Sequence, residues 1–267
     1  MKTFFIEEAQ KRKKILGVFK KIEHIGNKII INKKINKLNL KSKIKIVNKI
    51  IQILKKENVR QVAVEEELKK EIDFINLINS NNINICNPKW VLIHCTDKIV
   101  DLILDEKKIE KKESEISICV NEIDNLVEEY IYEFAKEFKR VNIITNHIGK
   151  FKKIEEKLYN EDGIILNITN NRKKGLTKSD IILNVDFPKE SLNEFNIFDK
   201  SIIINWDEHL KIRKKRFNGK IIEEINIKIS EDSEIRRFIE QNNLQNYDER
   251  DICQVLGTTS NIEIIIS

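Results

Sequence analysis

The chain has 267 residues, of which 40% are hydrophobic and 34% are charged, and its positive and negative residues are interspersed. This composition predicts a substantial folded core and argues against intrinsic disorder. Every apolar run is far shorter than the roughly 18 residues of a membrane span, so we expect no membrane insertion. The four cysteines lack CxxC or disulfide-like spacing, which indicates a cytoplasmic protein with reduced thiols. The abundance of Ile, Lys and Asn is typical of an AT-rich genome.

The charge is distributed unevenly along the chain. Residues 1–60 contain 18 Lys and Arg against 4 Asp and Glu, whereas residues 61–267 contain 31 against 39. Either the basic front is balanced by the acidic remainder, or it contacts a polyanion such as nucleic acid. The second interpretation requires that basic residues from two segments share one face: Lys11, Arg12, Lys13 and Lys14, with Lys43, Lys45, Lys49, Lys55 and Lys56. Whether the chain forms homo-oligomers stays open.

Strand-like and helix-like segments alternate from the start of the chain. We expect strands over residues 3–6, 28–32, 59–64 and 83–86, and helices over residues 9–22, 43–57 and 69–78, with Ser42 as an N-cap. Residues 90–104 fit either a strand or a helix. Residues 1–104 therefore predict a small, basic N-terminal α/β domain. Residues 105–115, DEKKIEKKESE, carry nine charges and predict a linker, or alternatively a solvated helical extension.

The segment from residue 116 to residue 267 has the clearest organisation. Apolar runs over residues 116–120, 141–145, 164–168, 181–185 and 201–205 are separated by amphipathic helical patterns over residues 123–138 and 148–158. This alternation predicts βαβ units in a doubly wound, mostly parallel α/β sheet. Beyond it we expect a helix over residues 206–217, a strand over residues 221–229, helices capped by Ser233 and Asp248, and a last strand over residues 262–266.

Residues 179–184, Ser-Asp-Ile-Ile-Leu-Asn, resemble a strand motif of shikimate dehydrogenase and glutamyl-tRNA reductase relatives. The wider likeness is to the Rossmann-like NAD(P)-binding superfamily and covers about ninety residues. It implies that the loop after this strand lies near a nicotinamide cofactor. The glycine-rich fingerprint of that superfamily is missing, because residues 120–124 contain no Gly and place Glu122 and Asp124 where phosphates would bind.

Ligands of doubly wound sheets bind at the carboxyl ends of the strands. The loops expected there supply six candidate cofactor-binding residues: Asn146, His147, Lys150, Thr169, Asn184 and Asp186. His147 is open to two interpretations, as a general base or as a loop histidine that caps the next helix. No catalytic residue, metal site or cofactor identity is predicted, since His94 and Asp97 would offer only two ligands where structural zinc needs four.

The intact α/β pattern and the missing phosphate loop together predict a degenerate Rossmann-like protein that acts as a regulatory or interaction module. One alternative is a dehydrogenase-like enzyme with an atypical nucleotide cofactor site. A second alternative is a non-specific nucleic-acid-binding protein that uses the basic front.

Overall fold

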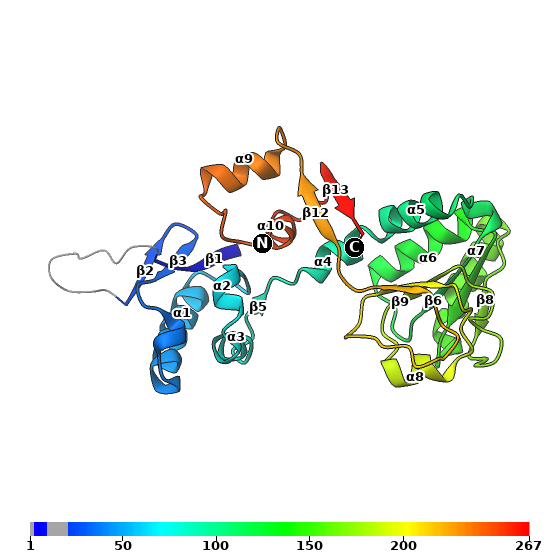
Figure 1. Ribbon diagram of the computed structural model, residues 1–267, viewed down its shortest axis with the longest axis horizontal. Helices are drawn as coiled ribbons and strands as arrows, with labels where there is room; N and C mark the ends of the chain where they lie inside the picture. The colour runs from blue at the N-terminus through cyan, green and yellow to red at the C-terminus, as the bar shows by residue number, and fades with distance from the viewer. Residues whose placement is uncertain (1–2, 10–20, 267) are drawn as a thin grey trace. The chain divides into compact units, whose positions relative to one another are not determined.

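The computed structural model describes residues 3–9 and 21–266. The chain divides into two compact units (Figure 1). Unit 1 comprises Met1–Val91 and Ile227–Glu263, and unit 2 comprises Leu92–Asn226 and Ile264–Ser267. Both units are built on largely parallel sheets flanked by helices, which confirms the predicted α/β class. The charged segment 105–115 lies inside unit 2, and a division into domains at residues 1–104 and 116–267 stays a prediction.

The sheet of unit 1 has five strands in the order β2-β3-β1-β4-β5. The strands are β1 (Thr3–Glu8), β2 (Ile22–Ile25), β3 (Lys28–Ile31), β4 (Gln61–Val64) and β5 (Asn84–Ile85). β1 pairs in parallel with β3 and β4, and β2 pairs antiparallel with β3. Because the strands on the two sides of β1 come from different crossovers, the carboxyl end of β1 is a switch point in strand order.

Two layers of helices cover this sheet (Figure 1). The helices of unit 1 are α1 (Leu40–Lys56), α2 (Glu66–Lys69), α3 (Ile72–Asn79), α9 (Glu234–Gln241) and α10 (Glu249–Leu256). Alternate residues of β1 face opposite ways. Phe4 belongs to the core cluster with α1 and α3, whereas Phe5 contacts the rings of Phe238 in α9 and Tyr247. The C-terminal helices thus complete the core of unit 1.

Several local predictions for unit 1 need correction. Helix α1 is capped by Asn39 and not by Ser42, whose own N–H donates to Asn39 Oδ1 at 3.0 Å. The helix expected over residues 69–78 begins later, since α3 starts at Ile72, and Lys69 is the last residue of a separate helix, α2. The helix expected over residues 9–22 falls mostly outside the described residues, and its last residue, Ile22, begins a strand.

The sheet of unit 2 has six strands, all parallel, in the order β11-β10-β9-β6-β7-β8. They are β6 (Glu115–Cys119), β7 (Arg140–Ile144), β8 (Asn167–Thr169), β9 (Ile181–Asn184), β10 (Ile202–Asn205) and β11 (Lys220–Ile222). Numbered from β6, this is the 3-2-1-4-5-6 order of a Rossmann fold. The doubly wound fold class is therefore confirmed, and the switch point lies between β6 and β9.

The helices of unit 2 include α5 (Thr96–Lys107), α6 (Asn125–Glu137), α7 (Lys152–Asp162) and the short α8 (Lys189–Glu194). A further helix, α4 (Lys89–His94), precedes α5, so residues 90–104 are helical. Helices α6 and α7 connect β6, β7 and β8, and right-handed crossovers place them on one face of the sheet. On the other face, α8 and neighbouring loops cover the apolar residues Cys119, Ile144, Ile182 and Ile203.

Three elements of unit 2 depart from expectation. β8 starts at Asn167, three residues later than predicted, because left-handed Gly163 ends α7 first. Residues 206–217 form no helix, since the Asn205 side chain bonds the carbonyls of Asp207 and Glu208 in a turn. The strand expected over residues 221–229 is two strands, β11 and β12 (Asn226–Ile229), of which β12 pairs with β13 (Ile262–Ile265).

Every helix in the described part of the chain is too short or too polar to cross a lipid bilayer.

Candidate functional site

The carboxyl ends of β6 and β9 form the edge of the unit 2 sheet where a Rossmann fold would bind its dinucleotide. Chain segments leave this edge through the loop after β6 and the loop after β9. In a dinucleotide-binding protein, the backbone N–H groups of the first loop and the N-terminus of the following helix receive the pyrophosphate. Whether these N–H groups are free or already hydrogen-bonded within the protein therefore decides what can bind here.

A carboxylate of the protein itself occupies the donors of the first loop. Asp186, just after β9, accepts hydrogen bonds from the N–H groups of Asn121 at 2.7 Å and Glu122 at 2.8 Å. Partial burial raises the pKa of Asp186, and these two N–H groups oppose that effect. Asp124 caps helix α6 by accepting from the N–H of Val127 at 2.8 Å. Both anion-binding features of the fold thus already hold protein carboxylates.

Two further predicted residues join this network. The N–H of Asn146 donates to Asn121 Oδ1 at 3.0 Å, and Lys150 Nζ donates to Glu122 Oε1 at 2.5 Å. The ion pair with Lys150 lowers the pKa of Glu122. The loops after β6, β7 and β9 are consequently linked. Lys150, the only lysine among the six predicted cofactor-binding residues, forms an ion pair with Glu122.

The remaining three predicted residues have separate surroundings. Asn184 is buried, and its carboxamide bonds the backbone N–H and carbonyl of Phe187 and the side chain of Asn205. Thr169 ends β8, and its hydroxyl accepts from the N–H of Asn171. His147 is exposed, and its backbone N–H, not its ring, bonds Thr145. The structure therefore brings Asn146, Lys150 and Asp186 into one network and places the other three outside it.

Among residues 3–9 and 21–266, no group of three or more His, Cys, Asp or Glu side chains is arranged to hold a metal ion. The ring of His94 and the carboxylate of Asp97 do not form such a group. The network of Asp186, Asn121, Glu122 and Lys150 holds three loops together.

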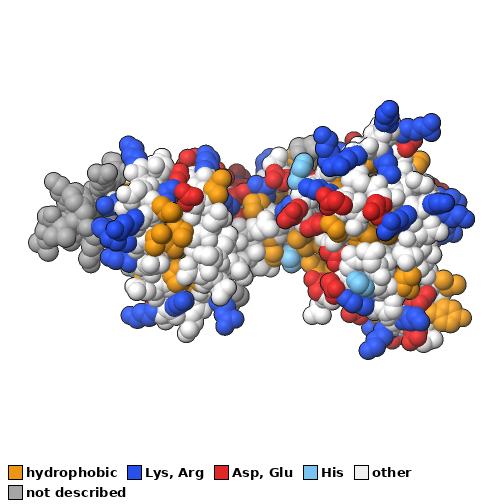
Figure 2. Space-filling view, turned by 90° about the horizontal axis from the view of Figure 1, so that it is seen from below, with side chains coloured by type: hydrophobic (Ala, Val, Ile, Leu, Met, Phe, Trp, Pro, Cys, Tyr) orange, Lys and Arg blue, Asp and Glu red, His pale blue; other side chains and the backbone are white. Residues whose placement is uncertain are grey.

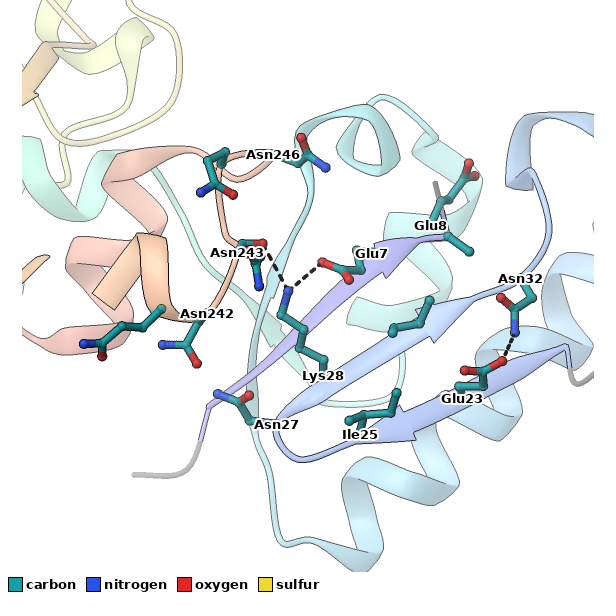
Figure 3. Close-up of a pocket in the computed structure, with 14 residues that line it drawn as sticks. Glu7, Glu8, Glu23, Ile25, Asn27, Lys28, Asn32, Asn242, Asn243 and Asn246 are labelled. Atoms are coloured by element: carbon teal, nitrogen blue, oxygen red, sulfur yellow. Dashed lines mark hydrogen bonds and ion pairs between the residues drawn. The ribbon is translucent and has the colours of Figure 1, made fainter. Parts of the chain in front are cut away.

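Unit 1 contains a second candidate site that the sequence did not point to. A pocket of about 780 Å³ lies on the face of its sheet opposite α1, between β1–β3 and the segment after α9 (Figure 3). Its walls carry side-chain amides, including Asn27, Asn243 and Asn246, and its floor includes Ile25 and Ile30. The sequence signal for this pocket was the Gln- and Asn-rich segment 241–246. Side-chain amides that do not alternate regularly with apolar residues suggest a polar surface.

Lys28 fixes one side of this pocket. Its ammonium donates to Glu7 Oε2 and to the carbonyl of Asn243, both at 3.1 Å (Figure 3). Glu7 also accepts from the hydroxyl of Tyr247 at 3.2 Å, and burial raises the pKa of that hydroxyl. β1, β3 and the C-terminal segment are thereby joined within unit 1. On the opposite side, Asn32 donates to Glu23 at 2.7 Å.

A buried carboxyl group lies beside this pocket, at the switch point of the unit 1 sheet. Glu65 follows β4, is 7% exposed, and accepts the N–H of Glu8 at 2.7 Å. Burial raises its pKa to about 7, and the charges of Glu8 and Glu7 act in the same direction, while Lys34 opposes them. Lys34 itself pairs with Glu8 at 2.8 Å. Glu65 therefore changes charge close to neutral pH.

One of the lysines of α1 that were expected to contact a polyanion is not on the surface. Lys43 is buried and pairs with Glu71 at 3.0 Å and Asp73 at 3.6 Å, so it does not face outward as the polyanion interpretation required. The other five lysines of α1 are exposed: Lys41, Lys45, Lys49, Lys55 and Lys56. Lys and Arg side chains gather at one end of unit 1 on the face shown in Figure 2. Residues 11–14 lie outside the described part of the chain.

No protein-family model and no curated protein sequence matches this chain. Solved structures with a partial likeness include L-tryptophan dehydrogenase from Nostoc punctiforme, with 9% identity, a TM-score of 0.31, and coverage of 67% of this chain and 50% of that one. Ornithine transcarbamoylase from Giardia lamblia has 12% identity, a TM-score of 0.32 and coverage of 76% and 72%. Ornithine carbamoyltransferase from Pyrococcus furiosus has 12% identity, a TM-score of 0.31 and coverage of 96% and 84%. This chain thus spans half the length of the tryptophan dehydrogenase, and its Rossmann-like assignment is based on its own strand order.

Proposed function

We propose that the protein is a degenerate Rossmann-like regulatory or interaction module whose first loop does not receive a dinucleotide pyrophosphate. The observation that supports this proposal is the pair of hydrogen bonds from the N–H groups of Asn121 and Glu122 to the carboxylate of Asp186. A pyrophosphate would need the same two donors, and its oxygens would meet the negative charge of Asp186 at close range.

Displacing Asp186 would also be costly for the protein. The carboxylate is partly buried, and each charge-assisted hydrogen bond that it loses is worth about 1.5–3 kcal/mol. Glu122 and Asp124 add further negative charge to the same loop. A dinucleotide would have to offset all of these terms before it gained any affinity. A fixed, acidic loop edge is better suited to contact with a partner.

The test is a titration of the whole protein with NAD(H), NADP(H), ATP and S-adenosylmethionine, followed by melting temperature and calorimetry. We expect no concentration-dependent rise in melting temperature, because a ligand that binds only the folded state always produces one. A saturable rise with any of these cofactors in the unmodified protein would overturn the proposal.

The matched variants are Asp186→Asn and Glu190→Gln. Glu190 is an exposed carboxylate at the start of α8 and serves as the control. Asp186→Asn keeps the shape but leaves one acceptor oxygen where two were used, and its NH2 group cannot accept from the second N–H, so we expect a loss of about 1–3 kcal/mol in stability. Glu190→Gln should change stability by less than about 0.5 kcal/mol. Equal effects of the two changes would show that Asp186 does not hold the loop.

A dehydrogenase-like enzyme with an atypical cofactor site is the second candidate. The observation that favours it is the raised pKa of Asp186, because a protonated Asp186 would release its charge-based hold on the loop donors. This candidate predicts that binding of NAD(P)H, followed by its fluorescence, strengthens as the pH falls or in Asp186→Asn. Absence of binding in both conditions would eliminate it.

A further inference from the structure

We propose that unit 2 binds the phosphate group of a small phosphate monoester at the amino end of its sheet, at the edge opposite the one that dinucleotides use in Rossmann folds. The site is a pocket of about 490 Å³, within the range of about 300–1,000 Å³ that small-molecule sites have. Its lining includes Glu115, Arg140, Asn142, Asn167, Lys174 and Lys178. None of the residues that carry the proposed function, Asp186, Asn121 and Glu122, lines this pocket.

The pocket results from an unusual connection. The chain passes from β8 back to β9 through residues 170–180 without forming a helix. In the first half of the same fold, each crossover carries a helix, α6 or α7. The sheet face over β6, β7 and β8 is therefore covered at this end only by a loop. Gly175 lets that loop pack tightly, since a Cβ there would lie 3.0 Å from Ile144 Cδ1.

Polar residues replace apolar ones beneath this loop. Ser117, Asn142 and Asn167 are in register on neighbouring strands, so their side chains lie in one row on the same face. We call these three residues the polar row. Ser117 is fully buried and Asn142 is 4% exposed, although the strands around them are rich in Ile. Asn167, at the end of the row, is exposed, whereas the two buried residues would cost stability unless they were hydrogen-bonded.

Hydrogen bonds along the row satisfy its buried members, Ser117 and Asn142. Asn167 Nδ2 donates to Asn142 Oδ1 at 2.7 Å, and Asn142 Nδ2 donates to Ser117 Oγ at 3.2 Å. Ser117 Oγ then lies 2.5 Å from Ser179 Oγ. The side-chain oxygen Oδ1 of Asn167 takes no part in these bonds, and Asn167 is exposed and lines the pocket. A hydroxyl of the ligand could donate to that oxygen.

The charges of the lining favour an anion. Three cationic side chains, from Arg140, Lys174 and Lys178, face one carboxylate, that of Glu115. Arg140 lies 3.5 Å from Glu115 and offsets it. Neither Lys174 nor Lys178 forms an ion pair with any described residue. The two remaining positive charges match the charge of a phosphate monoester, which is about −1.5 to −2 at neutral pH.

The test is a titration of the full chain with glycerol phosphate, with glycerol as the uncharged control and inorganic phosphate as the minimal probe. Backbone amide shifts in ¹⁵N spectra map the site. We expect saturable shifts from glycerol phosphate and inorganic phosphate in residues 140–142 and 174–178, and none from glycerol. No saturable shift, or shifts confined to other residues, would overturn the proposal.

Variants of the lining residues test the assignment through the affinity for glycerol phosphate. Lys174→Gln combined with Lys178→Gln should weaken glycerol phosphate binding by about tenfold or more, because each lost hydrogen bond to a charged group has an effect of that order. Lys173→Gln is the matched control, since Lys173 is exposed in the same loop but does not line the pocket. Asn167→Asp, at an exposed position, should also abolish binding by repulsion, and a thermal melt checks its folding because the change removes the donor to Asn142 Oδ1. Equal weakening in Lys173→Gln, or unchanged binding in Asn167→Asp, would refute the assignment.

Discussion

Replacement of Glu65 by Gln should make the protein more stable at alkaline pH and leave it nearly unchanged at acidic pH. Glu65 is 7% exposed and accepts the N–H of Glu8 at 2.7 Å, a bond that the oxygen of Gln can also accept. Burial raises the pKa of Glu65 from its ordinary value of 4.5 to about 7. The folded state therefore binds a proton over a pH range in which the unfolded state has released it.

The sign follows from proton linkage. Because the folded pKa is the higher one, stability is greatest below the unfolded value and falls as the pH rises through about 4.5–7. Each pH unit in that range removes about 1.4 kcal/mol, so the loss at about pH 8 is on the order of 3 kcal/mol. Gln carries no ionisable group and avoids this loss.

The assay is urea unfolding of the unmodified protein and Glu65→Gln at about pH 5 and about pH 8. We expect Glu65→Gln to be more stable by on the order of 3 kcal/mol at the higher pH and by less than about 1 kcal/mol at the lower pH. Asp251, whose pKa is raised to about 6 by burial, also titrates in this range but is the same in both proteins. Glu66→Gln, which changes an exposed carboxylate, is the control. A stability difference that is the same at both pH values would refute a buried, neutral Glu65.

Three further predictions concern other parts of the chain. Gly219→Ala should destabilise the protein by about 1–3 kcal/mol in a thermal melt, because a Cβ at Gly219 would overlap the carbonyl oxygen of Ser201. Gly149→Ala is the control: a Cβ at Gly149 meets open space, so this change should be neutral or slightly stabilising. Native protein should react slowly with a thiol reagent and denatured protein at once, since all four cysteines are buried and the pKa of Cys86 is raised to about 12. In an anisotropy titration, generic RNA should not bind at physiological salt. Binding that survives physiological salt, and that falls when the exposed lysines are replaced by Glu, would favour the nucleic-acid alternative over the present proposal. Those lysines are Lys45, Lys49, Lys55 and Lys56.

The strands of unit 2 were predictable because their physical cause is local. A parallel strand that is buried on both faces reads as a short continuous apolar run, and residues 181–184 are all fully or almost fully buried. Helix α10 was equally predictable from the sequence, since Asp248 caps its start and Gly257, in the left-handed conformation, ends it. Periodicity and capping act within a few residues, which is the range over which a single sequence carries a clear signal.

The sites were not predictable in the same way. Asp186 contacts the N–H groups of Asn121 and Glu122, which lie 65 and 64 positions earlier in the chain. No local sequence pattern encodes that contact. Residues 227–263 belong to unit 1 through side chains such as Tyr247, whose ring packs on Phe5. The polar row left one trace in the sequence, an Asn within each of two Ile-rich strands, which is meaningful only when the strands are known to be adjacent.

Asp186 and Lys178 flank the same strand, β9, and this arrangement allows a final test of whether the two edges of the unit 2 sheet act separately. The two residues are eight positions apart, which corresponds to about 26 Å when extended, at about 3.3 Å per residue. Effects of changes this far apart normally add to within about 0.3–0.5 kcal/mol. We therefore expect the stability loss from Asp186→Asn to be the same in the Lys178→Gln background, and glycerol phosphate binding to be unaffected by Asp186→Asn. A double-mutant cycle in unfolding and in binding measures both quantities. A coupling well above that range would contradict independent edges, and it would indicate that β9 transmits the state of one edge to the other.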